Sequence, residues 1–241
     1  ALQVVDRNDA SNVELGFECI VDTTVESLNA QGETVSVMEE RSRRYPLEDS
    51  MYDEVIERGG QPLAANETHK ERKRKQRFIQ NARKQKERGS GKRRDRRQVR
   101  FGRELMQRYR VSLGGVESVR GRGCWVLSYQ PRSGDLPRSG PMDGALNRSL
   151  GRLWLAQSDY ALVRLTFRLQ SPIRYVWGIL ATLNAANGEV DFDPVTPGVW
   201  LPSRFHLDLD LKLLGGLKSI RRRIQSQWSG YRPVAANPSA M

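Results

Sequence analysis

The sequence of 241 residues contains only two histidines and two cysteines. His69 and His206 lie far apart, and Cys19 and Cys124 do not form a C-x-x-C pair, so we expect no metal site and no cofactor. The G-x-S-x-G, H-E-x-x-H and P-loop spacings are absent as well. The sequence therefore predicts no catalytic group. The two cysteines are compatible with a disulfide and with two buried thiols.

Long apolar runs are also missing. The longest apolar stretch covers about residues 176–183 and is interrupted by Gly178 and Thr182. A membrane-spanning helix needs roughly 20 apolar residues, so none is expected. The first residues lack the charged and apolar regions of a signal peptide, which predicts either a protein that is not exported or a mature form.

The positive charge of the chain is concentrated in one segment. Residues 66–100 carry 16 Lys or Arg and 4 Asp or Glu, which accounts for the whole net charge of +12. Phe78 is the only aromatic residue in this segment, whereas modules that bind single-stranded nucleic acid interleave aromatic and basic residues. A solvated surface insert, a contact with anionic lipid and a contact with nucleic acid remain open. The candidate anion-binding residues are Lys70, Arg72, Lys73, Arg74, Lys75, Arg77, Arg83 and Lys84.

The basic segment begins with the pattern of a helix. Thr68 and Glu71 have the spacing of a capping box, good helix formers follow as far as Arg88, and Gly89 is a natural stop. The predicted helix is polar almost all round, because its apolar residues are limited to one small patch at Phe78, Ile79 and Ala82. We therefore expect it to lie on the surface or to project from the body of the protein.

Most of the remaining sequence alternates between apolar and polar residues with the period of a β-strand. The clearest case is 205–213, where Phe and Leu alternate with His206, Asp208, Asp210 and Lys212. Turns are predicted at 29–32, 114–115 and 187–188. The pattern predicts a mainly β protein, an antiparallel meander of nine or ten strands with one helical excursion. We expect a single domain over 1–241 with a basic insert at 66–100 and a disordered tail at 233–241.

Four segments resemble the bacterial outer-membrane lipoprotein-sorting (LolA-like) proteins, especially their larger uncharacterised periplasmic members. Residues 121–131 resemble the family strand that ends in an aromatic residue and a proline. Residues 151–165 resemble its hairpin with Trp, Asp-Tyr and a basic residue, and 198–202 resemble its G-x-W-x-P strand start. In the first half, 59–63 followed by the charged helix are similar to the larger members.

The resemblance implies a strongly curved antiparallel sheet that forms an incompletely closed barrel. It implies a non-enzymatic periplasmic binding protein that holds a lipid or lipoprotein acyl chain in an apolar concave groove, with an envelope transport or sensing role. Acyl chains are the expected partners, and an anionic membrane surface is a further one. The residues expected to line the groove are Trp125, Leu127, Trp154, Leu165, Phe167, Leu207 and Leu209.

Two other hypotheses come from different classes. The first is a nucleic-acid- or anionic-surface-binding protein that acts through the segment 66–100. The second is a glycan-active enzyme that uses Asp208 and Asp210, which share one strand face at a separation of roughly 7 Å. The plainer interpretation of these carboxylates, and of His206 beside them, is a solvated strand face.

Overall fold

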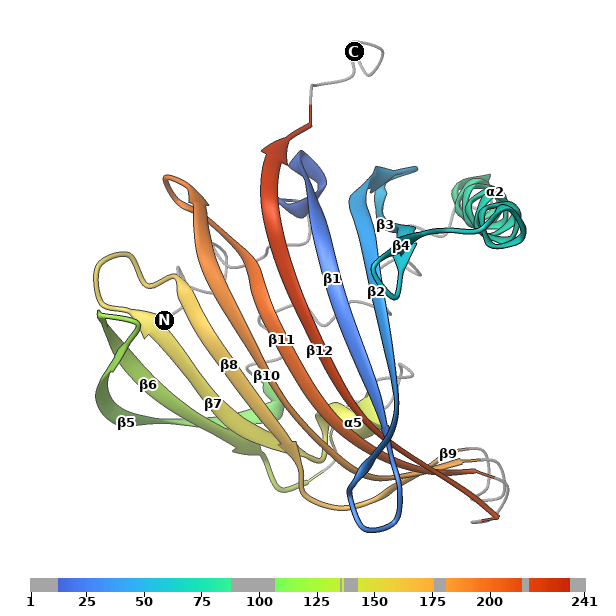
Figure 1. Ribbon diagram of the computed structural model, residues 1–241. Coiled ribbons are helices and arrows are strands. Elements are labelled where there is room, and N and C mark those ends of the chain that lie inside the picture. Colours follow the sequence, from blue (N-terminus) through green and yellow to red (C-terminus); the bar gives the residue numbers. More distant parts are fainter. Residues whose placement is uncertain are drawn as a thin grey trace.

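The computed structural model describes residues 13–87, 107–134, 136, 143–175, 181–213 and 217–234. Twelve strands form one antiparallel sheet, in the order β4-β3-β2-β1-β12-β11-β10-β8-β7-β6-β5, with β9 paired to β10. The edge strands β4 and β5 do not pair with each other, so the sheet is not closed. Figure 1 shows its strong curvature and its long central strands. The predicted class, a curved and incompletely closed antiparallel sheet with a helical insert, is confirmed.

The chain enters the middle of the sheet and returns to it at its end. The strands of the first half are β1 (Phe17–Leu28), β2 (Thr34–Leu47), β3 (Ser50–Arg58) and β4 (Gln61–Pro62), preceded by the short helix η1 (Glu14–Gly16). Those of the second half are β5 (Tyr109–Val119), β6 (Arg122–Pro131), β7 (Ser149–Ala156), β8 (Leu162–Leu169), β9 (Ile173–Tyr175), β10 (Ala181–Thr196), β11 (Val199–Leu213) and β12 (Lys218–Pro233). Strands β1 and β12 pair along their length, which joins the two halves.

In the described part of the chain, two further helices accompany the sheet. Helix α2 (Ala65–Glu87) lies beside β3 and β4 at one edge, and α5 (Asp143–Leu146) precedes β7 (Figure 1). A buried ion pair of 2.7 Å between Arg108 and Asp143 fixes α5 near the start of β5. None of the described helices is both long enough and apolar enough to cross a membrane.

Several predicted boundaries are wrong. The dipeptide 187–188 lies inside β10 and forms no turn, and 114–115 produces a bulge within β5. Helix α2 begins at Ala65, and Thr68 donates its hydroxyl to Leu63 O (3.3 Å) instead of capping the helix. Glu67 accepts the Ala64 N–H at 3.4 Å, so the acidic half of a capping box lies four residues earlier than predicted. The turn at 29–32 is confirmed by the 3.2 Å bond from Gly32 N to Asn29 O.

Strand β12 extends to Pro233, which pairs with Phe17. Residues 235–241 of the expected tail and 88–100 of the basic insert lie outside the described residues. The division of the chain into one domain, an insert and a tail stays a prediction.

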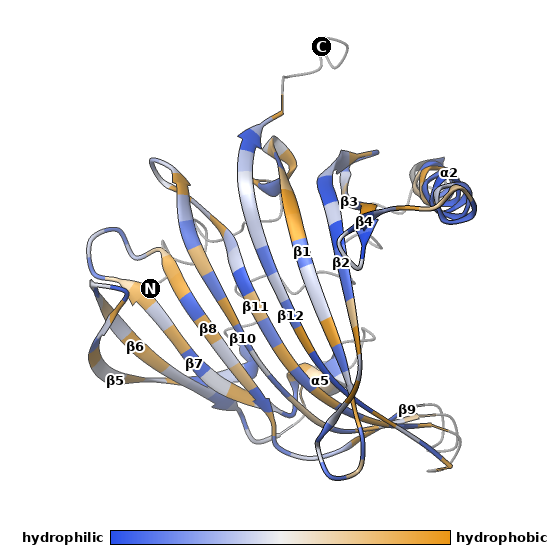
Figure 2. Ribbon diagram, viewed as in Figure 1, coloured by the Kyte–Doolittle hydropathy of each residue, from blue (hydrophilic) through white to orange (hydrophobic). Residues whose placement is uncertain are grey.

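The pleat separates two chemically different sheet faces. Cross-strand partners share a face and successive residues alternate, so the face of each side chain follows from the register. The apolar face carries Leu165, Phe167 and Leu207, and the polar face carries Arg164, Glu189 and His206. Figure 2 shows this alternation along the central strands. A compact core on the polar-face side of β5–β8 contains Cys124, Val126, Trp154, Ala156, Val119 and Val163.

Candidate functional site

The apolar face carries two adjacent cross-strand rows of large side chains. One row contains Leu127, Leu153, Leu165, Val190 and Phe205, and the other contains Tyr129, Phe167, Leu207, Ile224 and Val25. We call these ten residues the apolar band. All ten are half-buried, so each still presents apolar surface. The band crosses seven strands from β6 to β1, and six inter-strand steps of about 4.8 Å give a length of roughly 29 Å.

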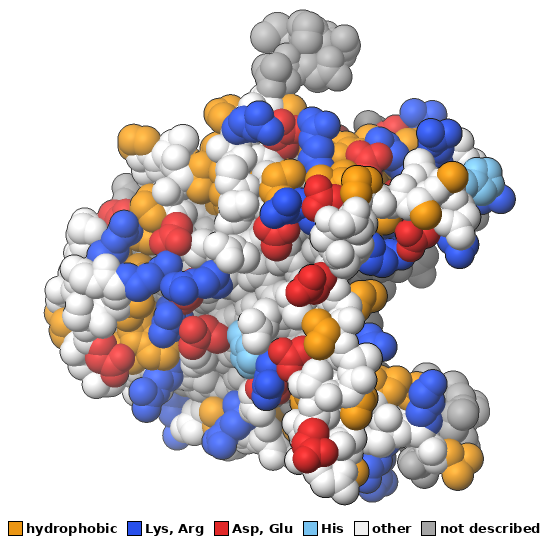
Figure 3. Space-filling view, in the orientation of Figure 1, with side chains coloured by type: hydrophobic (Ala, Val, Ile, Leu, Met, Phe, Trp, Pro, Cys, Tyr) orange, Lys and Arg blue, Asp and Glu red, His pale blue; other side chains and the backbone are white. Residues whose placement is uncertain are grey.

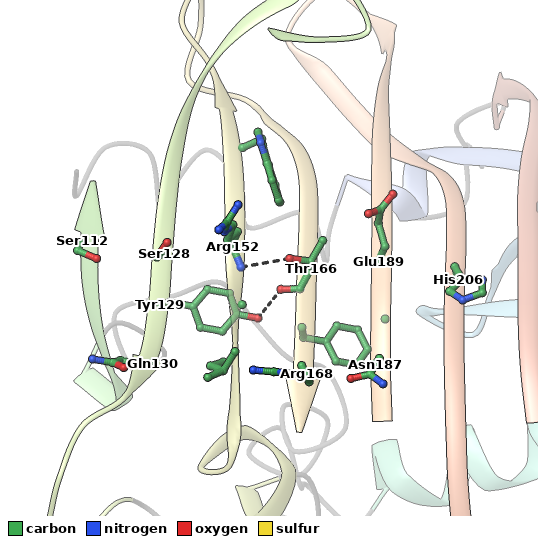
Figure 4. A pocket seen from close by; sticks show the side chains of 15 residues that line it. Ser112, Ser128, Tyr129, Gln130, Arg152, Thr166, Arg168, Asn187, Glu189 and His206 are labelled. Atoms are coloured by element: carbon green, nitrogen blue, oxygen red, sulfur yellow. Dashed lines mark hydrogen bonds between the residues drawn. The ribbon is translucent and has the colours of Figure 1, made fainter. Parts of the chain in front are cut away.

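Two glycines make room for the aromatic rings of the band. Gly151 lies between Tyr129 and Phe167 in the row, and Gly188 lies between Phe167 and Leu207. The Tyr129 hydroxyl passes β7 and donates to Thr166 O at 2.9 Å (Figure 4). A Cβ atom on Gly188 would collide with the Phe167 ring. The absence of two side chains therefore lets both rings lie flat across the sheet.

The structure gathers most of the expected groove residues on one face. Leu127, Leu165, Phe167 and Leu207 belong to the apolar band, while Leu209 and Trp125 lie in the neighbouring rows of the same face. Trp154 lies on the opposite face, in the compact core, and its indole N–H donates to Glu117 at 2.8 Å. Whether these residues bind a ligand stays a prediction.

Sequence reasoning missed six of the ten band residues, Tyr129 among them. Leu153, Val190, Phe205, Ile224 and Val25 come from strands whose neighbours could not be known before the sheet order. The alternation within a strand could have identified Phe205, because it lies two residues from Leu207 and therefore on the same side of β11. Without the pairing of β12 to β1, Ile224 and Val25 could not be added to that side.

On the polar face, ion pairs join neighbouring strands. Asp191 is only 3% exposed. Its carboxylate accepts a hydrogen bond from Arg164 Nε–H at 2.7 Å and forms an ion pair with Arg204 at 3.1 Å. The hydrogen bond to Asp191 raises the pKa of Arg164. Further along β11, Arg223 reaches Asp208 at 3.2 Å. These contacts neutralise most charges of the face in pairs.

The two carboxylates proposed for catalysis belong to this pattern. Asp208 contacts Arg223 and also His206 Nε2, which lies 3.0 Å from its Oδ2. Asp210 is held by Arg221 at 3.1 Å and by Asn184 at 3.1 Å. Each carboxylate thus has its own structural partners, and the arrangement agrees with a strand face stabilised by ion pairs.

The polar face is hollowed in two places. A depression of about 740 Å³ lies over β5–β8, β10 and β11, and a second of about 420 Å³ adjoins it. Glu189 and His206 line both. Figure 3 shows a hollow in the molecule with Lys/Arg and Asp/Glu side chains around it. The described depressions are therefore lined mainly by polar residues, and of the expected groove residues only Trp154 and Phe167 reach the larger one.

Helix α2 uses part of its positive charge to attach itself to the sheet. Arg74 hydrogen-bonds Glu71, and its guanidinium lies 4.9 Å from the centre of the Tyr52 ring. Lys75 contacts Glu54 at 3.0 Å, and its contacts with Tyr45 and then Glu54 raise the pKa of Lys75. These contacts explain why so polar a helix packs against β3.

The expected anion-binding residues therefore divide into two groups. Three of them contact acidic residues: Arg74, Lys75 and Arg83, the last at 2.8 Å from Glu48. Arg77 donates to the helix carbonyl of Lys73 at 3.3 Å. The side chains without an ion pair or hydrogen bond to any described residue are those of Lys70, Arg72, Lys73 and Lys84.

Both cysteines are buried and free. Burial raises the pKa of Cys19 to about 11 and also raises that of Cys124. Of the two alternatives that the sequence left open, the structure has two buried thiols. Among the described residues no group of three His, Cys, Asp or Glu side chains is placed to hold a metal ion.

Comparison with known proteins identifies similar folds among solved structures. No protein-family model and no curated protein matches the chain. A putative outer membrane lipoprotein-sorting protein domain from Vibrio parahaemolyticus is 12% identical, with a TM-score of 0.38, and the match covers 99% of this chain and 94% of that one. A LolA superfamily protein from Nitrosomonas europaea is also 12% identical, with a TM-score of 0.36 and coverage of 98% and 94%.

A DUF1329 family protein from Desulfovibrio piger is 10% identical, with a TM-score of 0.36, and the match covers 99% of this chain and 93% of that one. At these identities the likeness concerns the architecture and not the ligand. The chain is thus structurally similar, over nearly its full length, to outer membrane lipoprotein-sorting and LolA-like proteins.

Proposed function

We propose that this protein is a non-catalytic binding protein that holds the acyl chain of a lipid or lipoprotein against the apolar band. The observation that carries the proposal is the continuity of the band, ten half-buried apolar side chains across seven strands. Contiguous apolar surface of this kind is unfavourable in water and is characteristic of binding sites. An acyl chain needs only apolar contact and no reactive group.

The site would act in the bacterial periplasm, in transport or sensing of lipidated cargo. Four cations of α2 remain unpaired among the described residues, namely Lys70, Arg72, Lys73 and Lys84. They support a secondary contact with an anionic membrane surface, where each basic residue contributes about 1 kcal/mol. Nucleic acid is the less favoured partner of this segment, because its one aromatic side chain, Phe78, packs on Tyr52.

Two neighbouring residues of β11 allow a matched test. Leu207 lies in the apolar band, and His206 lies beside it on the opposite face. The L207S variant should bind a fluorescent C16 fatty acid about tenfold more weakly, since tenfold corresponds to about 1.4 kcal/mol. The H206S variant should bind it with unchanged affinity. The affinity should also change little with salt, because the contact is apolar.

The result that would contradict the proposal is equal binding by the wild type and L207S, or no binding of the fatty acid at all. Circular dichroism of both variants distinguishes loss of the site from loss of the fold. A steep fall of affinity with rising salt would instead indicate an electrostatic contact through the basic segment.

A further inference from the structure

The larger depression on the polar face contains two arginines without acidic partners. Arg152 on β7 and Arg168 on β8 both line this space of about 740 Å³. Among the described residues, neither side chain forms an ion pair or a hydrogen bond, and both are exposed. Figure 4 shows Arg168 extending from β8 toward β7.

This lack of partners sets the two arginines apart from their neighbours on the same face. Arg164 contacts Asp191 and Glu189, at 2.7 and 3.3 Å, and Arg204 contacts Asp191. Glu189 is the one acidic residue that lines the larger depression, and it is already engaged by Arg164. The depression therefore presents a net positive charge to whatever enters it.

The register places the backbones of the two arginines near each other. Arg152 is paired with Thr166, and Arg168 follows two residues later on the same face of β8. Diagonal neighbours of this kind have Cα atoms roughly 7–8 Å apart, within reach of two long side chains that converge on one group. Guanidinium groups bind phosphate and carboxylate oxygens in bidentate geometry.

Neutral donors complete the surroundings. The hydroxyl oxygen of Thr166 accepts the backbone N–H of Arg152 at 3.3 Å, which leaves the hydroxyl proton of Thr166 available. Ser112, Ser128, Gln130 and Asn187 line the same depression. Several donors around two arginines suit a ligand with three or four acceptor oxygens.

We propose that Arg152 and Arg168 form a binding site for a phosphate group. Arg152 and Arg168 lie on the face opposite the apolar band, although Tyr129 and Phe167 of the band also line the depression. The phosphate group could belong to a soluble phosphate ester or to a lipid headgroup, since both present the same oxygens.

The first test is a titration with inorganic phosphate, followed through the arginine Nε–Hε resonances in ¹⁵N NMR spectra. We expect the resonances of Arg152 and Arg168 to shift, with chloride at equal ionic strength as the reference. The double variant R152Q/R168Q should bind phosphate at least tenfold more weakly. R222Q is the control, because Arg222 is exposed, belongs to β12 and makes no ion pair with the described residues.

The second arm uses co-sedimentation with vesicles of phosphatidylcholine that contain 30% phosphatidylglycerol. Weaker vesicle binding by R152Q/R168Q than by R222Q assigns the phosphate to a lipid headgroup, whereas loss of inorganic phosphate binding alone assigns it to a soluble ester. Either result supports the site. Equal phosphate binding by the wild type, the double variant and R222Q would overturn it.

Discussion

Gly188 shows how a missing side chain shapes the surface of this sheet. It lies within β10, between Phe167 on one side and Leu207 on the other. Glycine normally weakens a strand, and in this sequence Asn187-Gly188 has the appearance of a hairpin turn. The Phe167 ring occupies the space that a Cβ atom would need. Gly188 is therefore required by side-chain packing and not by a positive φ.

Replacement of Gly188 by alanine should destabilise the protein. The Cβ atom would displace the Phe167 ring, and overpacking of this kind costs about 1–3 kcal/mol. Urea unfolding of G188A should show a lower midpoint than that of the wild type. G16A is the control, because no atom lies within 4 Å of the added Cβ atom and Gly16 has no positive φ. Equal midpoints for G188A and G16A would show that the ring moves without cost.

Helix α2 illustrates how an almost wholly polar helix can be held by one small cluster. Phe78 lies 4.9 Å from the Tyr52 ring, and the Tyr52 hydroxyl donates to Glu71 at 2.9 Å. Although burial acts to raise it, the pKa of Glu71 is lowered by hydrogen bonds from Arg74 and Tyr52. The carboxylate thus stays charged and links the helix to β3.

Removal of the Phe78 ring should detach the helix without unfolding the sheet. Phe78 is half-buried, so its loss should cost less than the about 3–5 kcal/mol of a fully buried Phe→Ala change, but isolated helices have little stability of their own. In F78A, amide hydrogen exchange of α2 should become at least tenfold faster, while exchange in β10–β12 stays unchanged. Q76A serves as the control, since Gln76 is an exposed residue of the same helix. Unchanged hydrogen exchange of α2 in F78A would show that the salt bridges alone are sufficient to hold the helix against the sheet.

The molecule as a whole is an open sheet whose two faces differ in chemistry. The alternation of apolar and polar residues at 205–213 is enough to predict an amphipathic strand. Several segments of this kind together predict the antiparallel meander. The order of the strands was not predictable, because the pairing of β1 with β12 joins residues about 200 positions apart. Consequently the sequence groups Trp154 with residues of the opposite face, and it does not indicate the partners of Asp208 and Asp210.

The basic segment is the most conspicuous feature of the sequence, but in the structure part of its charge holds helix α2 against the sheet. The charge of Arg74, Lys75 and Arg83 is compensated by acidic residues of the sheet side and of α2 itself. Charge counting could not show this, since Glu48 and Glu54 lie outside 66–100. The apolar band therefore remains the central candidate for ligand binding.

The most direct test of that account is to locate a bound acyl chain. Methyl NMR spectra recorded with spin-labelled stearic acid report which Leu, Val and Ile methyl groups lie near the chain. We predict strong broadening for Leu165, Leu207 and Val25, which belong to the apolar band, and little for Val126 in the core on the other face. Broadening confined to methyl groups outside the band, or none at all, would contradict the proposed function.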